Sequence, residues 1–207
     1  MERADIRGLG VCLLAGSPPP PWTDVAEPVT AALESGISWI QYRDKERSRR
    51  EIYRNALILR EITSRFNACL IINDHADIAL AVDAEGVHLG QEDLPLREAR
   101  RIMGDRIIGI STHSLEQALE AEKGGADYIG FGPVFPTMTK DAGEPKGVET
   151  LRQIVRSVRM PVIAIGGIKA GNLLFVIGTG CAGVAVSSGI LEGDLRKNAQ
   201  AFLSGFR

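Results

Sequence analysis

Eight short apolar runs recur along the chain, and no other feature of the sequence restricts its fold as strongly. Each run is continuous and does not alternate with polar residues, which is typical of strands covered on both faces. The runs are VCLLA from Val11, SWIQY from Ser38, CLIIND from Cys69, GVHLG from Gly86, IIGIS from Ile107, YIGFGPV from Tyr128, PVIAIGG from Pro161 and GVAVSSGI from Gly183. They predict eight strands of one parallel sheet.

Longer segments with helical character separate these runs. They occupy residues 24–33, 48–66, 94–103, 114–123, 148–158 and 195–203, and shorter helical pieces are expected at 76–82 and 171–177. Small residues often precede a strand, as at Gly36 and Gly86, where glycine suits the end of a helix. Strands that alternate with helices imply a parallel sheet with right-handed crossovers.

Eight such units most simply close into a (β/α)8 TIM barrel, an α/β fold. With 207 residues, of which 44% are hydrophobic, we expect a single domain over residues 1–207. An open, doubly wound sheet is the alternative. The glycine fingerprint of dinucleotide-binding sheets does not follow the first strand, where the sequence reads AGSPPPP, so the barrel is favoured.

Charge and hydropathy limit the partners that this chain can have. The 24 basic and 26 acidic side chains leave a formal net charge of −2, so no basic face for nucleic acid is expected. No apolar run approaches the roughly 20 residues that span a membrane, and the N-terminal residues do not resemble a signal peptide. Cys12, Cys69 and Cys181 adjoin apolar segments and are expected to be reduced core residues. We therefore predict a cytoplasmic protein, with a homo-oligomer left open.

Polar residues follow seven of the predicted strands, and in barrels of this kind the active site lies at the carboxyl ends of the strands. From the second strand to the eighth, these residues are Gln41, Arg43 and Lys45; Asn73 and Asp74; Gln91 and Asp93; Ser111, Thr112 and His113; Thr137, Thr139 and Lys140; Gly166 and Gly167; and Ser187 and Ser188. We expect these groups to collect at one rim of the barrel.

The types of these residues indicate phosphate and a hard cation. Arg43, Lys45 and Lys140 can surround phosphate oxygens from separate strand ends. Asp74 and Asp93 follow neighbouring strands, and a pair of carboxylates suits Mg²⁺, which completes its coordination with water and phosphate. The turns after the last two strands occupy the place where many barrels hold a phosphate through backbone N–H groups. The sequence thus predicts one metal-assisted and one metal-free phosphate site.

Several of these side chains have alternative structural roles. Asp74 and Asp93 can each cap the helix that follows. His88 lies inside an apolar strand, where a hydrogen-bonded structural role is favoured over that of a catalytic base. For His113, a role at the start of a helix is favoured over proton transfer. No Ser–His–Asp or Cys–His arrangement stands out, so covalent catalysis is not indicated.

Taken together, the strand-end segments resemble the thiamine phosphate synthase family over about residues 36–190. The ordered set is specific, because the aspartates of ND and GQED lie 19 residues apart. The resemblance implies a transferase that joins 4-amino-5-hydroxymethyl-2-methylpyrimidine diphosphate to a thiazole phosphate and releases pyrophosphate by a Mg²⁺-assisted dissociative substitution. The matching segments are QYRDK (41–45), IIND (71–74), GVHLGQEDL (86–94), IGIST (108–112), DYIGFGPVFPTMTK (127–140), AIGGI (164–168) and VAVSSGI (184–190).

Matched position by position, this resemblance implies a role for each polar residue. Asp74 and Asp93 correspond to the Mg²⁺ ligands of the family. Among the substrate contacts, Ser111, Lys140 and Arg43 are the expected catalytic residues. The implied contacts are Gln41 with the pyrimidine, Ser111 near the reacting centre, Arg43, Lys45, Asn73 and Lys140 with the diphosphate, and Thr137, Thr139, Gly167, Ser187 and Ser188 with the thiazole phosphate.

The first strand departs from the family's pattern, which commonly has a Thr-Asp pair after an aromatic residue at its end. Here the sequence reads VCLLAGSPPPPW, and Pro18 to Pro21 are expected to stiffen a rim segment. Two other functions follow if this change matters. One is a thiazole tautomerase of a related barrel family, with His113 as the proton-transfer residue. The other is a non-catalytic barrel that binds thiazole or thiamine phosphate.

Overall fold

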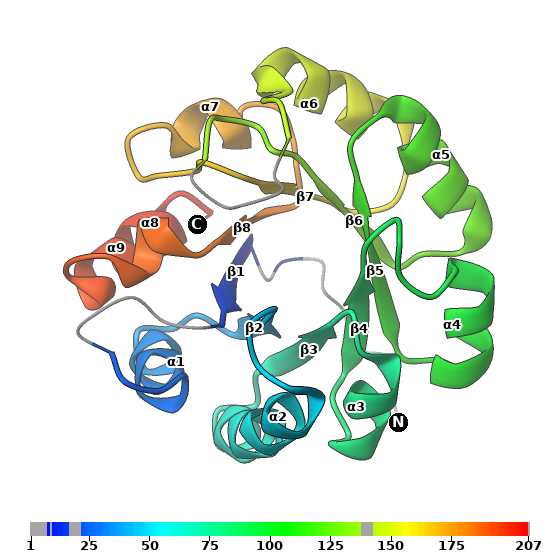
Figure 1. Ribbon diagram of the computed structural model, residues 1–207. Helices are drawn as coiled ribbons and strands as arrows, with labels where there is room; N and C mark the ends of the chain where they lie inside the picture. Colours follow the sequence, from blue (N-terminus) through cyan, green and yellow to red (C-terminus); the bar gives the residue numbers. More distant parts are fainter. Residues whose placement is uncertain (1–7, 9, 17–21, 138–142, 207) are drawn as a thin grey trace.

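The computed structural model describes residues 8, 10–16, 22–137 and 143–206 and contains a closed barrel of parallel strands in the order β1 to β8 (Figure 1). The barrel closes where Gly10 of β1 pairs with Gly183 of β8. The prediction of a TIM barrel is therefore confirmed, and the open sheet is wrong. The strands are β1 (Gly10–Ala15), β2 (Trp39–Tyr42), β3 (Cys69–Asn73), β4 (Gly86–Leu89), β5 (Ile107–Thr112), β6 (Tyr128–Phe131), β7 (Val162–Ile165) and β8 (Gly183–Val186).

Helices surround the barrel as an outer ring, and each crossover between neighbouring strands carries one (Figure 1). Their apolar faces cover the outside of the sheet, which explains why the strand sequences are continuously apolar. The helices are α1 (Ala26–Glu34), α2 (Arg49–Arg65), α3 (Ala76–Ala81), α4 (Leu96–Met103), α5 (Leu115–Gly124), α6 (Gly147–Ser157), α7 (Leu173–Ile177), α8 (Ser188–Leu191) and α9 (Leu195–Ser204).

Most element boundaries differ from the sequence-based expectation by one to three residues, and two differences have a clear local cause. α1 begins at Ala26, because the side chain of Asp24 accepts hydrogen bonds from the backbone N–H groups of Ala26 and Glu27 and so precedes the helix. The short helix α8 differs from the sequence-based expectation, in which GVAVSSGI forms one strand. At Ser187 the backbone leaves the extended region, with φ −114° and ψ −88°, and the chain turns into α8.

The buried residues form two groups. The larger group fills the space between the strands and the helices. The smaller group fills the barrel interior, where the rings of Trp39 and Tyr128 meet edge to face with centroids 5.3 Å apart. Cys12, Cys69 and Cys181 are buried and free, as expected of core residues. Among the helices described here, none is long and apolar enough to cross a membrane.

Candidate active site

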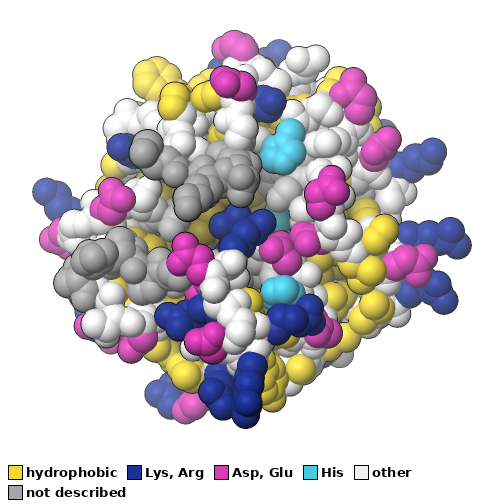
Figure 2. Space-filling view, in the orientation of Figure 1, with side chains coloured by type: hydrophobic (Ala, Val, Ile, Leu, Met, Phe, Trp, Pro, Cys, Tyr) yellow, Lys and Arg dark blue, Asp and Glu magenta, His cyan; other side chains and the backbone are white. Residues whose placement is uncertain are grey.

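A cavity of about 380 Å³ opens at the carboxyl ends of the strands. Figure 2 shows Lys, Arg, Asp, Glu and His side chains gathered around the centre of the face seen along the barrel. Every predicted substrate-contact residue that the structure describes lines this cavity. These residues are Gln41, Arg43, Lys45, Asn73, Ser111, Thr137, Gly167, Ser187 and Ser188. Thr139, Lys140 and the segment Pro18 to Pro21 lie outside the described residues.

A chain of side-chain hydrogen bonds crosses the ends of β2 and β3. The Gln41 amide donates through Nε2 to Asn73 Oδ1 over 2.8 Å. Asn73 then donates through Nδ2 to Asp74 Oδ1 over 2.5 Å. The ammonium group of Lys45 lies 3.9 Å from Asp74 Oδ2. Gln41 and Asn73 are almost fully buried. The two hydrogen bonds therefore hold both side-chain amides in one orientation, in which the Asn73 N–H points at the Asp74 carboxylate.

Asp74 and Asp93 form a carboxyl pair that does not itself line the cavity; Asp74 contacts two residues that do, Asn73 and Lys45. Burial raises the pKa of Asp74 to about 6, and Asp93 adds to this rise through a hydrogen bond and through charge repulsion. The positive charges of Lys45 and Arg43 act in the opposite direction. Asp93 Oδ2 accepts a hydrogen bond from the backbone N–H of Gly90 over 2.7 Å. Neither carboxylate caps a helix, because α3 and α4 begin after His75 and Pro95 without a side-chain cap. The helix-cap alternative is therefore wrong for both residues.

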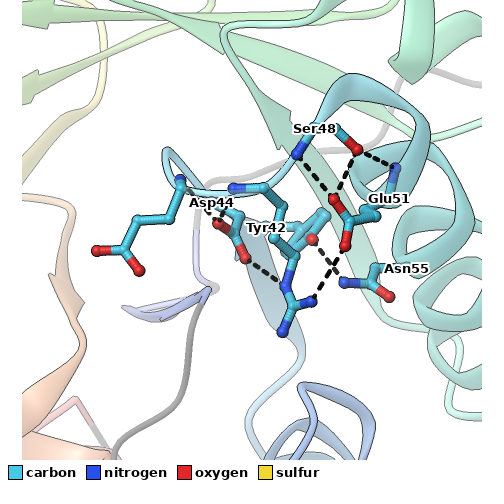
Figure 3. A network of polar contacts seen from close by, with 7 residues as sticks. Tyr42, Asp44, Ser48, Glu51 and Asn55 are labelled. Atoms are coloured by element: carbon cyan, nitrogen blue, oxygen red, sulfur yellow. Dashed lines mark hydrogen bonds and ion pairs between the residues drawn. The ribbon is translucent and has the colours of Figure 1, made fainter.

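The loop between β2 and α2 presents Arg43 and Lys45 to the cavity and is held from below by Asp44. The buried Asp44 carboxylate accepts from the backbone N–H groups of Glu46 and Arg47 at 3.1 and 3.2 Å and pairs with the Arg47 guanidinium (Figure 3). The next residue, Ser48, forms a capping box with Glu51 at the start of α2. The buried Asp44 carboxylate, between the half-buried Arg43 and the exposed Lys45, thus fixes the loop conformation.

The segment after β6 packs against the glycine turn after β7. The N–H of Val134 donates to Ile165 O and that of Phe135 to Gly166 O, at 2.9 and 3.1 Å. Gly167 has φ +65°, and a Cβ atom there would lie 2.4 Å from the carbonyl oxygen of Pro136. Only glycine allows this approach. The contact carries the chain past the turn and brings Thr137 to the cavity wall.

The histidines differ in their surroundings. His88 is buried, and its two ring nitrogens contact Tyr128 Oη and Ser111 Oγ, each over 2.9 Å. This is the hydrogen-bonded structural role favoured from the sequence, although His88 also lines the cavity. His113 contacts the Gly132 carbonyl through Nδ1 at 2.7 Å. Its backbone N–H donates to Gln117 in the first turn of α5, which agrees with a role at the helix start.

Three charged residues of the cavity wall, Asp44, Glu46 and Lys169, are not among the residues predicted from the sequence. Lys169 directly follows the segment AIGGI, two residues beyond Gly167, the last residue predicted to act at that strand end. Asp44 lies between the predicted phosphate-binding residues Arg43 and Lys45, but an acidic side chain does not itself indicate phosphate binding. Its significance depends on the fold, since only the loop conformation turns it inward.

The combination of a parallel barrel, strand-end cations, a carboxylate pair and a glycine turn defines a phosphate-binding barrel enzyme. The family described as "Thiamine monophosphate synthase" matches residues 14–190, and this chain belongs to that family. The family resemblance seen in the sequence is thereby confirmed, together with the expectation of an enzyme that is a transferase.

Individual relatives agree with this family. A thiamine-phosphate synthase from Caldanaerobacter subterraneus subsp. tengcongensis is 47% identical over 186 residues, which cover 89% of this chain and 87% of that protein. One from Pyrococcus furiosus is 49% identical and covers 83% of each chain. The solved thiamine phosphate pyrophosphorylase from Pyrococcus furiosus superposes with a TM-score of 0.88 at 42% identity, covering 97% of this chain and 96% of that one.

Proposed function

We propose that this protein is a thiamine phosphate synthase, which joins 4-amino-5-hydroxymethyl-2-methylpyrimidine diphosphate to a thiazole phosphate, with or without a carboxylate on the thiazole. The products are thiamine phosphate and pyrophosphate. The observation that carries the proposal is that residues implied for the pyrimidine, the diphosphate and the thiazole phosphate all line the same cavity. The names of the curated relatives support the same reaction.

The cations and amides of β2 and β3 suit the diphosphate. Arg43 and Lys45 lie in the loop that Asp44 holds, so their charges face the cavity at the strand end. When the bond between pyrimidine methylene and diphosphate breaks, negative charge grows on the departing oxygens, and cations held in place stabilise it. Lys140 is expected from the resemblance to contribute to this charge. Ser111 would contact the pyrimidine near the reacting carbon.

The opposite wall suits the second phosphate. Gly167 belongs to the turn after β7, while Ser187 and Ser188 lie where β8 passes into α8. Backbone N–H groups and hydroxyls at such a turn bind phosphate without a metal. Thr137 and Thr139 are proposed as further contacts on this side. The arrangement would hold the thiazole nitrogen facing the pyrimidine methylene carbon while pyrophosphate leaves.

The carboxyl pair fits Mg²⁺. Asp74 and Asp93 lie within hydrogen-bonding contact, and the raised pKa of Asp74 reflects negative charge that a divalent cation would balance. Among the described residues there is no group of three or more His, Cys, Asp or Glu that could hold a metal. This is compatible with Mg²⁺, which takes one or two carboxylates and fills its coordination with substrate phosphate and water. When bound, the ion would neutralise charge on the leaving pyrophosphate.

The test measures pyrophosphate release and thiamine phosphate formation from both substrates, with and without Mg²⁺. We expect product only with Mg²⁺. Asp93→Asn keeps an acceptor for the Gly90 N–H but removes the charge, and it should lower the rate by about 100-fold or more. Asp83→Asn is the matched control, because Asp83 pairs with Arg106 before β4, at the opposite end of the barrel.

No product from the wild-type protein with both substrates and Mg²⁺ would reject the synthase and favour the tautomerase or the non-catalytic barrel. The tautomerase needs proton transfer at His113, which a thiazole isomerisation assay with His113→Gln would detect. A cytoplasmic location, a homo-oligomer and a single domain over residues 1–207 stay predictions.

A further inference from the structure

A histidine and a tyrosine meet inside the barrel, because they lie in one row across the sheet with a glycine between them. In the strand register, His88 of β4 pairs with Gly109 of β5, and Gly109 pairs with Tyr128 of β6. A Cβ atom on Gly109 would lie 2.5 Å from His88 Nδ1 and 2.1 Å from Tyr128 Cζ. The missing side chain on the middle strand therefore opens the space in which the outer two residues meet.

The contact continues towards the cavity. His88 Nδ1 lies 2.9 Å from Tyr128 Oη, and His88 Nε2 lies 2.9 Å from Ser111 Oγ. Ser111 is two residues beyond Gly109 on β5, on the same side of the strand and closer to its carboxyl end. Ser111 lines the cavity, whereas Tyr128 is 1% exposed and belongs to the barrel interior. The row thus connects the interior of the barrel to the site.

The direction of both hydrogen bonds follows from the tyrosine. The Tyr128 hydroxyl keeps its proton, because burial raises its pKa well above the ordinary value. In the described part of the chain its only hydrogen-bond partner is His88. A buried hydroxyl that failed to donate would cost about 1–3 kcal/mol, so Tyr128 donates and His88 Nδ1 accepts.

The neutral imidazole then carries its proton on Nε2. Because Nδ1 accepts the hydrogen bond from Tyr128, it bears no proton of its own, and the ring is therefore neutral. A neutral imidazole has one donor and one acceptor nitrogen. With Nδ1 occupied as the acceptor, Nε2–H donates to Ser111 Oγ. The hydroxyl of Ser111 keeps its own proton to donate elsewhere.

We propose that Tyr128 and His88 are positioning residues that set the polarity of Ser111, so that its hydroxyl donates a hydrogen bond to an acceptor atom of the substrate in the cavity. This inference rests on the proposed function for the identity of that substrate. The pyrimidine diphosphate substrate offers two kinds of acceptor, the pyrimidine ring nitrogens and the diphosphate oxygens. A substrate group that is itself only a donor would be disfavoured at this position.

The first experiment reads the tautomer of His88 without any substrate. Long-range ¹H–¹⁵N correlation spectra of the labelled protein at pH 7 should show a neutral ring with its proton on Nε2, and His88→Gln assigns the signals by their loss. A proton on Nδ1, or a protonated ring, would overturn the proposal. Because this measurement does not depend on activity, its result is separate from the success or failure of the synthase assay.

The second experiment is a double-mutant cycle on kcat/KM. Tyr128→Phe removes the donor to Nδ1, so neither tautomer is preferred, and kcat/KM should fall about fivefold. In the Ser111→Ala background the same change should have no further effect. An equal loss in both backgrounds would mean that Tyr128 does not act through Ser111. Tyr53→Phe is the matched control, because the Tyr53 side chain is exposed on the outer face of α2, and it should leave kcat/KM unchanged.

Two probes distinguish the acceptor. Ser111→Ala should weaken inhibition by the pyrimidine alcohol if a ring nitrogen accepts, and by pyrophosphate with Mg²⁺ if a diphosphate oxygen accepts. Either loss supports a donor at Ser111, while unchanged inhibition by both probes contradicts it. Should Tyr128→Phe fail to fold, the tautomer of the wild-type protein and these two probes still decide the proposal.

Discussion

Asn73 donates its side-chain N–H to the Asp74 carboxylate over 2.5 Å and so connects an amide of β3 with the proposed metal pair. The same amide accepts from Gln41 through Oδ1. Its orientation is thus set from both sides, and Asp74 receives a donor that cannot rotate away. Residues that hold metal ligands in this way contribute to metal affinity without touching the ion.

Replacing Asn73 with Asp should weaken the response to Mg²⁺. The change removes the donor and adds a negative charge beside Asp74, which makes the carboxylate harder to ionise. We expect the Mg²⁺ concentration for half-maximal activity to rise by about 10-fold or more. Titrating the synthase rate with Mg²⁺ measures this. Asn67→Asp, before β3 at the other end of the barrel, is the control, and an equal shift in both variants would contradict the role of Asn73.

Removing the Asp44 carboxylate should reduce activity by more than the accompanying loss of stability explains. Asp44→Ala frees the loop that presents Arg43 and Lys45, so kcat/KM should fall by about 10-fold or more. Ser48→Ala is the comparison, because it removes the cap of α2 but leaves the contacts of Asp44 (Figure 3). That variant should lose about 1 kcal/mol of unfolding free energy and little activity. If both variants lose activity in proportion to stability, Asp44 has no separate role in the loop.

Stability should fall on acidification because of His88. Its folded-state pKa is about 4, below the ordinary value of 6.5, so the unfolded chain binds a proton first as the pH falls. The contribution of the neutral ring is complete above pH 6.5 and is lost towards pH 4, by up to about 3 kcal/mol. Urea unfolding of wild type and His88→Gln at pH 7 and pH 5 measures the difference.

The control for this prediction is His75→Gln. Burial, with a contribution from Arg49, also lowers the pKa of His75, but that side chain is far less enclosed, so its effect should be smaller. A pH dependence that is the same in wild type and His88→Gln would show that other groups cause the acid destabilisation.

Asp127 is expected to matter for stability and not for the site. Before β6, at the amino ends of the strands, its Oδ2 accepts from the Ile108 N–H over 2.8 Å and from Arg100 over 2.6 Å. Asp127→Ala leaves a buried backbone donor without this acceptor and should cost about 1–3 kcal/mol of unfolding free energy. Chemical denaturation measures the loss, and kcat/KM of the folded variant should stay unchanged. A large drop in kcat/KM would place Asp127 in the function after all.

The eight strands, their order in the sheet and the rim at which polar residues gather could all be predicted from the sequence. Continuous apolar runs are required wherever both faces of a strand are covered, so the eight strands were readable locally. The same locality allowed Asp74, Asp93 and Ser111 to be placed at strand ends. The turn into α8 was missed, because SSGI after an apolar run carries no strong helix signal.

The contacts between side chains from different strands could not be predicted in this way, because they depend on the folded barrel. Asp74 and Asp93 lie 19 residues apart in sequence, and their contact depends on the backbone turns that follow β3 and β4. The meeting of His88 with Tyr128 depends on strand register and on the missing side chain at Gly109 between them. Register and side-chain direction arise from closure of the whole barrel, a cooperative property that no local window of sequence contains.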